Sequence, residues 1–309
     1  MNTRVGFVSF VGRPNAGKST LLNAVVGQKI AGVSAKPQTT RNKILGIANQ
    51  GESQMLFLDT PGMHRLSKSV TINSLMNREA FSVIQQSDLI FFMIDLTVGF
   101  TAKDKSFLES VLKEADVPVC LLLSKADKCN RARRSEVARE VEEAMTSLAD
   151  PNGVLQSGLQ MVSAKQKESI APLLEYIAPK LPEGEWLYGE DEMTDRPTRF
   201  IAGELIREKV FRTLGDEIPY QTAVRIDEME FKSNIVNILA SVIVARDSQK
   251  GMVIGKRGAK IKEIGITARA ELESLLGQKV FLDLQVKVDS GWFQDCSLIA
   301  EYSELGEGL

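Results

Sequence analysis

The chain has 309 residues, of which 43% are hydrophobic and 25% charged, and its formal net charge is -2. This length suits two globular domains, and the near-neutral charge excludes a generally basic nucleic-acid-binding protein. The three cysteines lie far apart without a CxxC pair, which excludes a disulfide framework and a cysteine zinc site. This cysteine pattern fits a reducing cytoplasm. No apolar run approaches the roughly 18 residues needed to span a bilayer.

The first part of the chain alternates between buried-strand and amphipathic-helix patterns. Strands are predicted over 5–12, 88–95, 117–125 and 159–165, and helices over 69–86, 103–115 and 169–181. Strands that are apolar throughout and separated by helices indicate a parallel sheet covered on both faces. The sequence therefore predicts a doubly wound α/β domain that binds its ligand at the carboxyl ends of the strands.

The second part of the chain follows an acidic stretch, residues 183–197, which carries six acids and ends in a proline. We expect this stretch to be a linker, with Trp186 and Tyr188 docking it against a domain. Beyond it, helices are predicted over 198–214 and 266–277, and strands over 222–231, 235–245 and 280–288. The predicted organisation is a nucleotide-binding domain over 1–180, a linker over 181–198 and a small α+β domain over 199–309.

The clearest motif is "GRPNAGKST", Gly12 to Thr20, which follows a strand, opens a helix and matches the phosphate-loop pattern GxxxxGK[ST]. Its glycines permit tight turns, so that backbone N–H groups and the helix dipole can surround phosphates. Lys18 would neutralise the β- and γ-phosphate oxygens, and Ser19 would ligate Mg²⁺.

Three further motifs lie at the ends of strands, and the last two indicate which purine is bound. In "FLDTPG", Asp59 is placed to hold Mg²⁺ through water, and the Gly62 N–H can meet the γ-phosphate. In "SKAD", the Asp127 carboxylate can accept both N1–H and N2–H of guanine, a donor pair that adenine lacks. In "VSAK", the Ala164 N–H can meet the guanine O6.

The ordered set GRPNAGKS, PQTTR, DTPG, SKAD and VSAK resembles the five motifs of GTPases in the translation-factor-related class. This resemblance implies GTP hydrolysis, with Thr40 completing the Mg²⁺ sphere and Thr39 as its alternative. It also implies slow, K⁺-stimulated turnover, because Asn15 occupies the K⁺-binding position and Met63 cannot orient water. The usual Asn of the fourth motif, which contacts guanine N7 and braces the phosphate loop, is replaced by Ser124, a loss expected to weaken nucleotide affinity.

The resulting candidate residues fall into three groups. The catalytic candidates are Lys18, Thr40, Asn15 and Gly62, and the metal candidates are Ser19, Thr40, Asp59 (through water) and Asn15 (K⁺). The nucleotide-binding candidates are Gly12, Arg13, Pro14, Asn15, Ala16, Gly17, Lys18, Ser19, Thr20, Asp59, Thr60, Pro61, Gly62, Ser124, Lys125, Ala126, Asp127, Ser163, Ala164 and Lys165. The expected cofactors are GTP or GDP with Mg²⁺ and K⁺.

A second glycine-rich stretch, "KGMVIGKRGAKIKEIG", lies in the last part of the chain. It lacks the GK[ST] hydroxyl of a phosphate loop, and residues 246–262 carry six basic residues and one acidic residue. The order helix, strand, strand, helix, GxxG, helix, strand resembles a type II KH domain, whose glycines let an RNA backbone approach closely. The RNA-binding candidates are Ile254, Gly255, Lys256, Arg257, Gly258, Lys260 and Lys262.

A GTPase joined to a type II KH domain resembles the Era family of bacterial ribosome-assembly GTPases, over nearly the whole chain. The resemblance implies a monomer that binds the 3′ end of small-subunit (16S) rRNA during 30S maturation, with loose contact at the inner face of the cell membrane. Two alternatives remain from the residues: a GTPase switch whose KH-like domain binds a protein partner, and an RNA-binding protein with weak nucleotide dependence.

Overall fold

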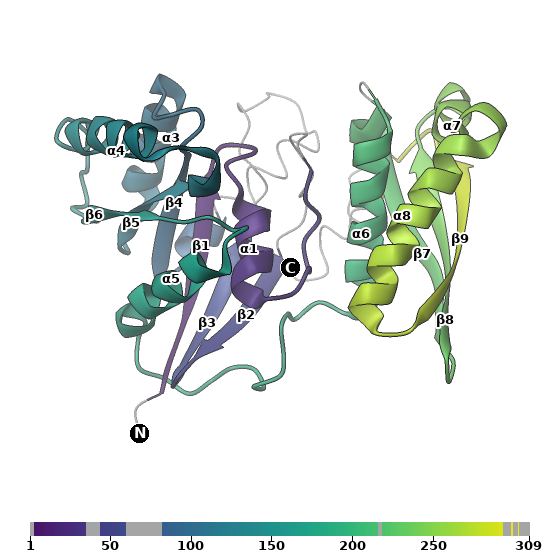
Figure 1. The fold of residues 1–309 in the computed structure, drawn as a ribbon, viewed down its shortest axis with the longest axis horizontal. Helices are drawn as coiled ribbons and strands as arrows, with labels where there is room; N and C mark the ends of the chain where they lie inside the picture. The colour runs from purple at the N-terminus through teal and green to yellow at the C-terminus, as the bar shows by residue number, and fades with distance from the viewer. Residues whose placement is uncertain are drawn as a thin grey trace. The chain divides into compact units, whose positions relative to one another are not determined.

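The computed structural model describes residues 3–34, 44–59, 82–215 and 218–292, together with 298 and 302 (Figure 1). Contacts within the chain divide it into two compact units. Of the described residues, the first unit comprises 3–30, 44–59 and 82–195, and the second comprises 31–34, 196–215 and 218–292 with 298 and 302.

The first unit is built on a six-stranded sheet in the order β2-β3-β1-β4-β5-β6. Its strands are β1 (Arg4–Gly12), β2 (Ile44–Gln50), β3 (Ser53–Asp59), β4 (Leu89–Asp95), β5 (Val119–Ser124) and β6 (Leu155–Met161). Only the edge strand β2 is antiparallel to its neighbour, and the other pairs are parallel. The predicted doubly wound, mostly parallel sheet is confirmed.

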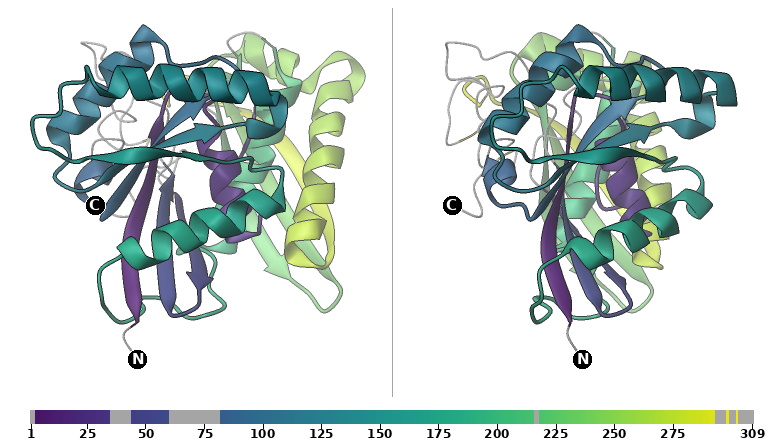
Figure 2. Two further views of the ribbon diagram at one scale, coloured as in Figure 1. Left: turned by 60° about the vertical axis from the view of Figure 1, so that its left-hand side comes forward. Right: turned by 90° about the vertical axis from the view of Figure 1, so that its left-hand side faces the viewer.

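Helices cover both faces of this sheet (Figure 2). They are α1 (Lys18–Val26), α3 (Ala102–Glu114), α4 (Arg131–Met145) and α5 (Ile170–Ile177). On one face, α3 and α4 pack over Ile90, Phe92 and Ile94 of β4. On the other, the α5 residue Tyr176 packs against Phe91. Alternate residues of β4 thus enter two cores, which explains why its apolar run is continuous.

The last strand of this sheet lies earlier in the sequence than predicted. β6 ends at Met161, so the motif residues 163–165 follow the strand and lie in the loop before α5. The predicted strand over 159–165 is therefore wrong in its bounds. The loop geometry follows from side-chain bonding, because the Ser169 hydroxyl accepts the Ser163 N–H at 3.0 Å and donates to the Ser163 carbonyl at 2.7 Å.

The acidic stretch after α5 packs along the first unit. The side-chain oxygen of Gln54 in β3 accepts the N–H groups of Leu187 and Tyr188 at 2.9 and 3.0 Å. The indole N–H of Trp186 donates to the Glu52 carbonyl at 3.1 Å. The docking role predicted for Trp186 and Tyr188 is confirmed, and the division between the two units falls after Asp195.

The second unit is a three-stranded sheet in the order β7-β8-β9, with β7 antiparallel and β9 parallel to β8. Its elements are α6 (Thr198–Thr213), β7 (Thr222–Phe231), β8 (Ile235–Val244), α7 (Asp247–Ile254), α8 (Ala259–Leu276) and β9 (Lys279–Val288). Helices α6 and α8 pack against each other and on this sheet (Figure 1). The order αββααβ is the predicted type II KH topology.

Helix α8 begins earlier than predicted. The sequence indicates a helix from 266, whereas α8 begins at Ala259, directly after Gly258. Gly258 has φ 77° and forms the left-handed N-cap of the helix. The GxxG loop therefore joins α7 to α8 with no other linker, because its glycines supply the turn that ends one helix and starts the next.

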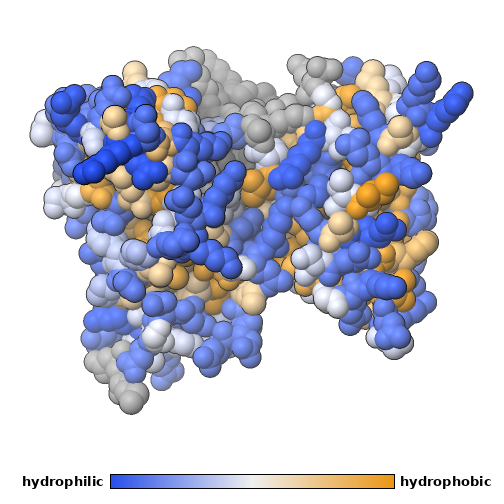
Figure 3. Space-filling model, in the orientation of Figure 1, coloured by the Kyte–Doolittle hydropathy of each residue, from blue (hydrophilic) through white to orange (hydrophobic). Residues whose placement is uncertain are grey.

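No helix among the described residues is long and apolar enough to cross a membrane. On the face of the molecule drawn in Figure 3, most of the surface is hydrophilic and the apolar areas are separate.

Candidate functional site

The phosphate loop connects the carboxyl end of β1 to the start of α1. A Cβ atom on Gly12 would lie 2.7 Å from the Met93 carbonyl oxygen of the neighbouring strand β4, so only glycine fits there. Asn15 and Gly17 have φ values of 65° and 100°, in the left-handed region. This backbone turns the loop back on itself and brings Lys18 beneath it.

Lys18 lies buried inside the loop that precedes it. Its ammonium donates to the carbonyls of Gly12 at 2.9 Å and Arg13 at 3.1 Å. Burial lowers the pKa of Lys18 to about 8, and the opposing charge of Asp59 at the end of β3 raises it in part. A cation held at this cost inside a ring of backbone groups fits a phosphate, which would supply the missing negative charge.

The described metal candidates lie on the elements beside this loop. Ser19 is in the first turn of α1, and Asp59 is a buried carboxylate at the end of β3. A carboxylate and a hydroxyl are hard oxygen ligands of the kind Mg²⁺ prefers. Thr40, Thr60, Pro61 and Gly62, as well as Met63 and Thr39, lie outside the described residues.

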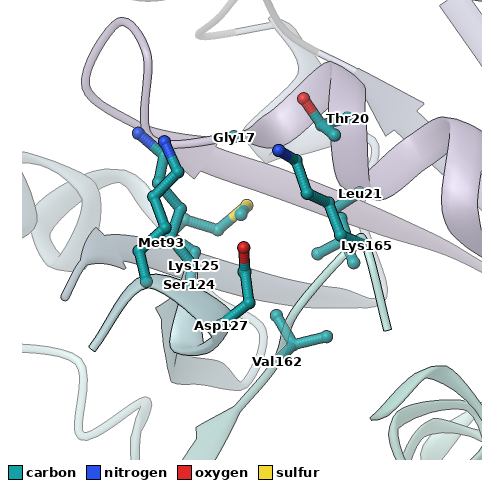
Figure 4. A pocket seen from close by; sticks show the side chains of 11 residues that line it. Gly17, Thr20, Leu21, Met93, Ser124, Lys125, Asp127, Val162 and Lys165 are labelled. Carbon is teal, nitrogen blue, oxygen red and sulfur yellow. The ribbon is translucent and has the colours of Figure 1, made fainter. Parts of the chain in front are cut away.

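A pocket next to the phosphate loop unites the candidates from three motifs (Figure 4). It is lined by Gly17, Thr20, Leu21, Met93, Ser124, Lys125, Asp127, Lys128, Val162, Ala164 and Lys165. In this view the Asp127 carboxylate lies between the side chains of Lys125 and Lys165. Gly17, Thr20 and Leu21 come from the phosphate loop and α1. The other lining residues lie near or beyond the carboxyl ends of β4, β5 and β6, where a parallel sheet places its ligand.

Asp127 is oriented by the last motif. The Ser163 hydroxyl donates to Asp127 Oδ1 at 2.7 Å. Ala126 is buried, and its N–H donates to the Val162 carbonyl at 3.2 Å. These bonds join the segments that follow β5 and β6, so Asp127 and Ala164 border the same pocket.

Lys125 runs beside the phosphate loop. It has φ 58°, and its side-chain Cε lies 3.9 Å from the position of a Cβ on Gly17. Its ammonium forms a 2.5 Å ion pair with Asp95 at the end of β4. The stem of Lys125 thus forms a wall of the pocket while its charge is held at the rim.

Ser124 retains one of the two roles that the resemblance assigns to asparagine. Its hydroxyl is buried and lies 2.7 Å from the Ala16 carbonyl of the phosphate loop and 3.1 Å from the Ile94 carbonyl. The hydroxyl therefore braces the loop, which corrects the expectation that the brace is lost with the asparagine. Serine is too short to extend farther into the pocket.

Arg13 and Pro14 belong to the loop but not to the pocket lining. The Arg13 guanidinium donates to the Thr101 hydroxyl at 3.2 Å, beside α3. Sequence reasoning missed four residues that line the pocket: Leu21, Met93, Lys128 and Val162. Met93 could have been found from its place at the carboxyl end of a predicted central strand.

The second candidate site is the GxxG loop of the second unit. A Cβ on Gly255 would lie 2.8 Å from the Lys260 side chain, whereas nothing lies within 4 Å of a Cβ on Gly258. Gly255 thus packs closely within the loop, and Gly258 leaves open space at the start of α8. Of the basic candidates, Lys256, Arg257 and Lys262 are exposed and Lys260 is half-buried, while Ile254 is half-buried at the end of α7.

These two sites agree with the comparisons with known proteins. Residues 7–125 match the family model described as a 50S ribosome-binding GTPase, and residues 217–293 match that of a KH domain. GTPase Era of Ectopseudomonas mendocina is 42% identical over 293 residues, which cover 95% of this chain and 94% of the relative. GTPase Era of Geobacter sp. (strain M21) is 42% identical over 300 residues, 97% of each chain.

The chain belongs to the GTPase Era family. Two solved Era structures have the same fold across both units. Era of Aquifex aeolicus bound to GDP·AlF₄⁻ has a TM-score of 0.88 and 35% identity, covering 97% of this chain and 99% of that one. Era in complex with MgGDPNP and nucleotides 1506–1542 of 16S ribosomal RNA has a TM-score of 0.87 and 36% identity, covering 97% and 98%.

Proposed function

We propose that this Era-family protein binds and hydrolyses GTP in its first unit and binds the 3′ end of 16S rRNA through its GxxG loop. The observation that carries the first part is the pocket in which Asp127 lies beside the phosphate loop. A carboxylate that accepts two donors selects guanine, because adenine would leave it without matching N–H groups.

The residues present fit GTP with Mg²⁺. Lys18 would contact the phosphates, while Ser19, Thr40 and, through water, Asp59 would hold Mg²⁺, which supplies positive charge against the phosphate oxygens. Lys125 would lie along the base, and the N–H groups of the loop would meet the phosphates. Gly62 would offer its N–H to the γ-phosphate, and Asn15, in its left-handed conformation, would hold K⁺.

Guanine selection is tested by exchanging one hydrogen-bond acceptor for a donor. An Asp127→Asn variant presents an amide that matches the O2 carbonyl of xanthine better than the N2 amine of guanine. We expect its affinity for GDP to fall by at least about 100-fold and its affinity for XDP to rise. An equal loss of affinity for GDP and XDP would contradict the role of Asp127 in reading the base. Equally tight binding of ATP and GTP by the wild-type protein would refute guanine selection.

K⁺ stimulation is tested separately from binding. The GTPase rate of the purified protein should be higher in KCl than in NaCl at equal ionic strength. An Asn15→Ala variant should lose this difference while retaining GDP binding. Equal rates of the wild-type protein in the two salts would refute the role of Asn15.

The RNA-binding part rests on the charge and geometry of the GxxG loop. The exposed Lys256 and Arg257 lie between Gly255 and Gly258, at the N-terminus of an 18-residue helix. Such a helix end and its adjacent cations attract phosphates. The relative bound to nucleotides 1506–1542 of 16S rRNA supports the choice of RNA.

A pair of glycine substitutions at the two ends of α8 tests this part. Gly258 and Gly277 both have left-handed φ values, 77° and 64°, and both have open space around a Cβ. Gly258→Asp places a carboxylate in the loop and should weaken binding of a 16S 3′-end oligonucleotide by at least about tenfold. The matched control Gly277→Asp should bind as the wild-type protein does.

Equal binding by the two aspartate variants would refute the loop as the RNA site. In the wild-type protein the binding constant should fall with salt, with a log–log slope of about -0.7 for each phosphate contact. If no RNA binds but a protein is retained by the second unit, the alternative of a GTPase switch with a protein partner would replace the proposal. RNA binding that is unchanged by nucleotide would favour the other alternative.

We also propose that the protein acts in 30S maturation. It would act as a monomer in the cytoplasm, with peripheral contact at the membrane. Its GTP-binding domain would comprise 1–180, its linker 181–198 and its KH domain 199–309. Family membership supports the assembly role. Fractionation of cell extracts tests it: the protein should sediment with free 30S particles in the presence of a non-hydrolysable GTP analogue. Its absence from these particles would refute the role.

A further inference from the structure

The side chain of Arg13, the residue after the first glycine of the phosphate loop, is bound to the start of α3. Its Nη1 donates to the Thr101 hydroxyl at 3.2 Å and lies 3.4 Å from Asp104 Oδ2. The Arg13 side chain is 36% exposed and that of Asp104 is 6% exposed. The cation therefore reaches a carboxylate that is almost completely removed from water.

Asp104 is held in place at the start of α3. It forms a capping box with Thr101: the Thr101 N–H donates to Asp104 Oδ2 at 3.0 Å, and the Asp104 N–H donates to the Thr101 hydroxyl at 3.3 Å. The helix that it begins has 13 residues and buries Leu108, Val111 and Leu112 in the core. The Thr101 hydroxyl also donates to Asp104 Oδ2. Arg13 adds a cation beside this buried carboxylate, whose negative charge is costly to bury without one.

The main chain of Arg13 contacts the other functional part of the loop. Its carbonyl accepts the Lys18 ammonium at 3.1 Å and the Ala16 N–H at 3.2 Å. One residue therefore connects α3 to the lysine that would bind phosphate. A rotation of this peptide would move the carbonyl that holds Lys18 and the N–H groups that follow it.

A similar arrangement occurs at the other end of the connection between β4 and α3. Asp95, the last residue of β4, forms the 2.5 Å ion pair with Lys125 and accepts the Thr97 N–H at 2.9 Å. The connection from Asp95 to Asp104 thus ends in two carboxylates. Asp104 binds Arg13 of the phosphate loop, and Asp95 binds Lys125 of the pocket beside it.

We propose that Arg13 is a positioning residue, which keeps the phosphate loop in its nucleotide-binding shape by tying it to α3 through Asp104 and does not itself contact the nucleotide. The inference rests on the proposed nucleotide site. The rival role is a direct contact between the guanidinium and a phosphate, and the two roles differ in what Asp104 contributes.

The test measures the release of a fluorescent GDP analogue and the KM and kcat for GTP with the full chain. Arg13→Ala and Asp104→Asn should each speed release and raise KM by about threefold to tenfold, with a smaller change in kcat. The double variant should be no worse than Arg13→Ala alone, because Asp104→Asn removes only the charge with which Arg13 pairs. Arg13→Lys should restore part of the loss, and Arg139→Ala, on exposed α4, should behave as wild type.

Direct phosphate contact would appear as faster release from Arg13→Ala with normal release from Asp104→Asn, and this result would overturn the proposal. Additive effects in the double variant would also overturn it. Thermal unfolding midpoints measured in parallel identify a merely structural effect: release that changes only in variants with a lowered midpoint contradicts a positioning role. If the wild-type protein and Arg139→Ala both fail to bind GDP, the proposed function fails instead.

Discussion

The serine that replaces asparagine in the fourth motif allows a sharp test of how the phosphate loop is held. Ser124 is 3% exposed, and its single hydroxyl proton can serve the Ala16 carbonyl at 2.7 Å or the Ile94 carbonyl at 3.1 Å. Ser124→Ala removes this donor and leaves a buried acceptor without it. Losing such a hydrogen bond costs about 1–3 kcal/mol of stability. The share of this free energy that held the phosphate loop in its shape is lost from nucleotide binding.

If about 1 kcal/mol of this cost falls on the loop, the Kd for GDP rises roughly fivefold in Ser124→Ala. Ser124→Asn should have the opposite effect. Its amide keeps a donor for the Ala16 carbonyl and extends into the pocket, which Ser124 already lines, toward the base. We expect GDP to bind about fivefold more tightly to this variant, a gain of one hydrogen bond.

The assay is calorimetric titration of each variant with GDP, with ADP as the competitor that measures selectivity. Ser110→Ala is the matched control, because that serine hydroxyl also donates to a carbonyl, at 2.9 Å, but on the exposed side of α3. Selectivity against ADP should remain in all variants, since Asp127 is unchanged. Wild-type affinity in Ser124→Ala would refute the brace, and weaker binding by Ser124→Asn would show that the pocket has no room for the amide.

Three further predictions concern burial in each unit. GDP affinity should fall about fourfold between pH 7 and 8.5. The Lys18 pKa of about 8 means that above that pH the lysine must take up a proton when GDP binds. Lys18→Met should lack this fall, and a wild-type affinity that does not change with pH would refute the lowered pKa of Lys18. Gly12→Ala should lower the free energy of unfolding by about 1–3 kcal/mol in urea titrations, because its Cβ meets a backbone oxygen at 2.7 Å, and unchanged stability would contradict this. Glu204→Gln should lower the free energy of unfolding by about 3–5 kcal/mol, because it leaves Arg207, whose side chain is 6% exposed, without its buried charge partner. Glu143→Gln, in an exposed ion pair, should lower it by under about 1 kcal/mol. Equal losses of stability in the two variants would refute the argument.

The mostly parallel sheet and the GxxG topology could be predicted from the sequence because they depend on local patterns, whereas the strand over 44–50 was not predicted. Continuous apolar runs such as β4 identify a doubly covered sheet, and alternation along β9 identifies a sheet with one covered face. Element bounds were less accurate. β6 ends before the Ser163 motif, and α8 begins at Ala259, because side-chain bonding and a glycine cap set these limits.

The sequence by itself determined the motifs whose chemistry lies in a short stretch of backbone: the phosphate loop, the motif of Asp127, for which we propose guanine recognition, and the GxxG loop. Tertiary structure alone decided the contacts that hold these motifs in place. Ser124 braces Ala16 across 108 residues, Arg13 reaches Asp104 across 91, and Gln54 fixes Tyr188 across 134. No local pattern specifies such pairs, because their partners meet only where the sheet brings the carboxyl ends and edges of separate strands together.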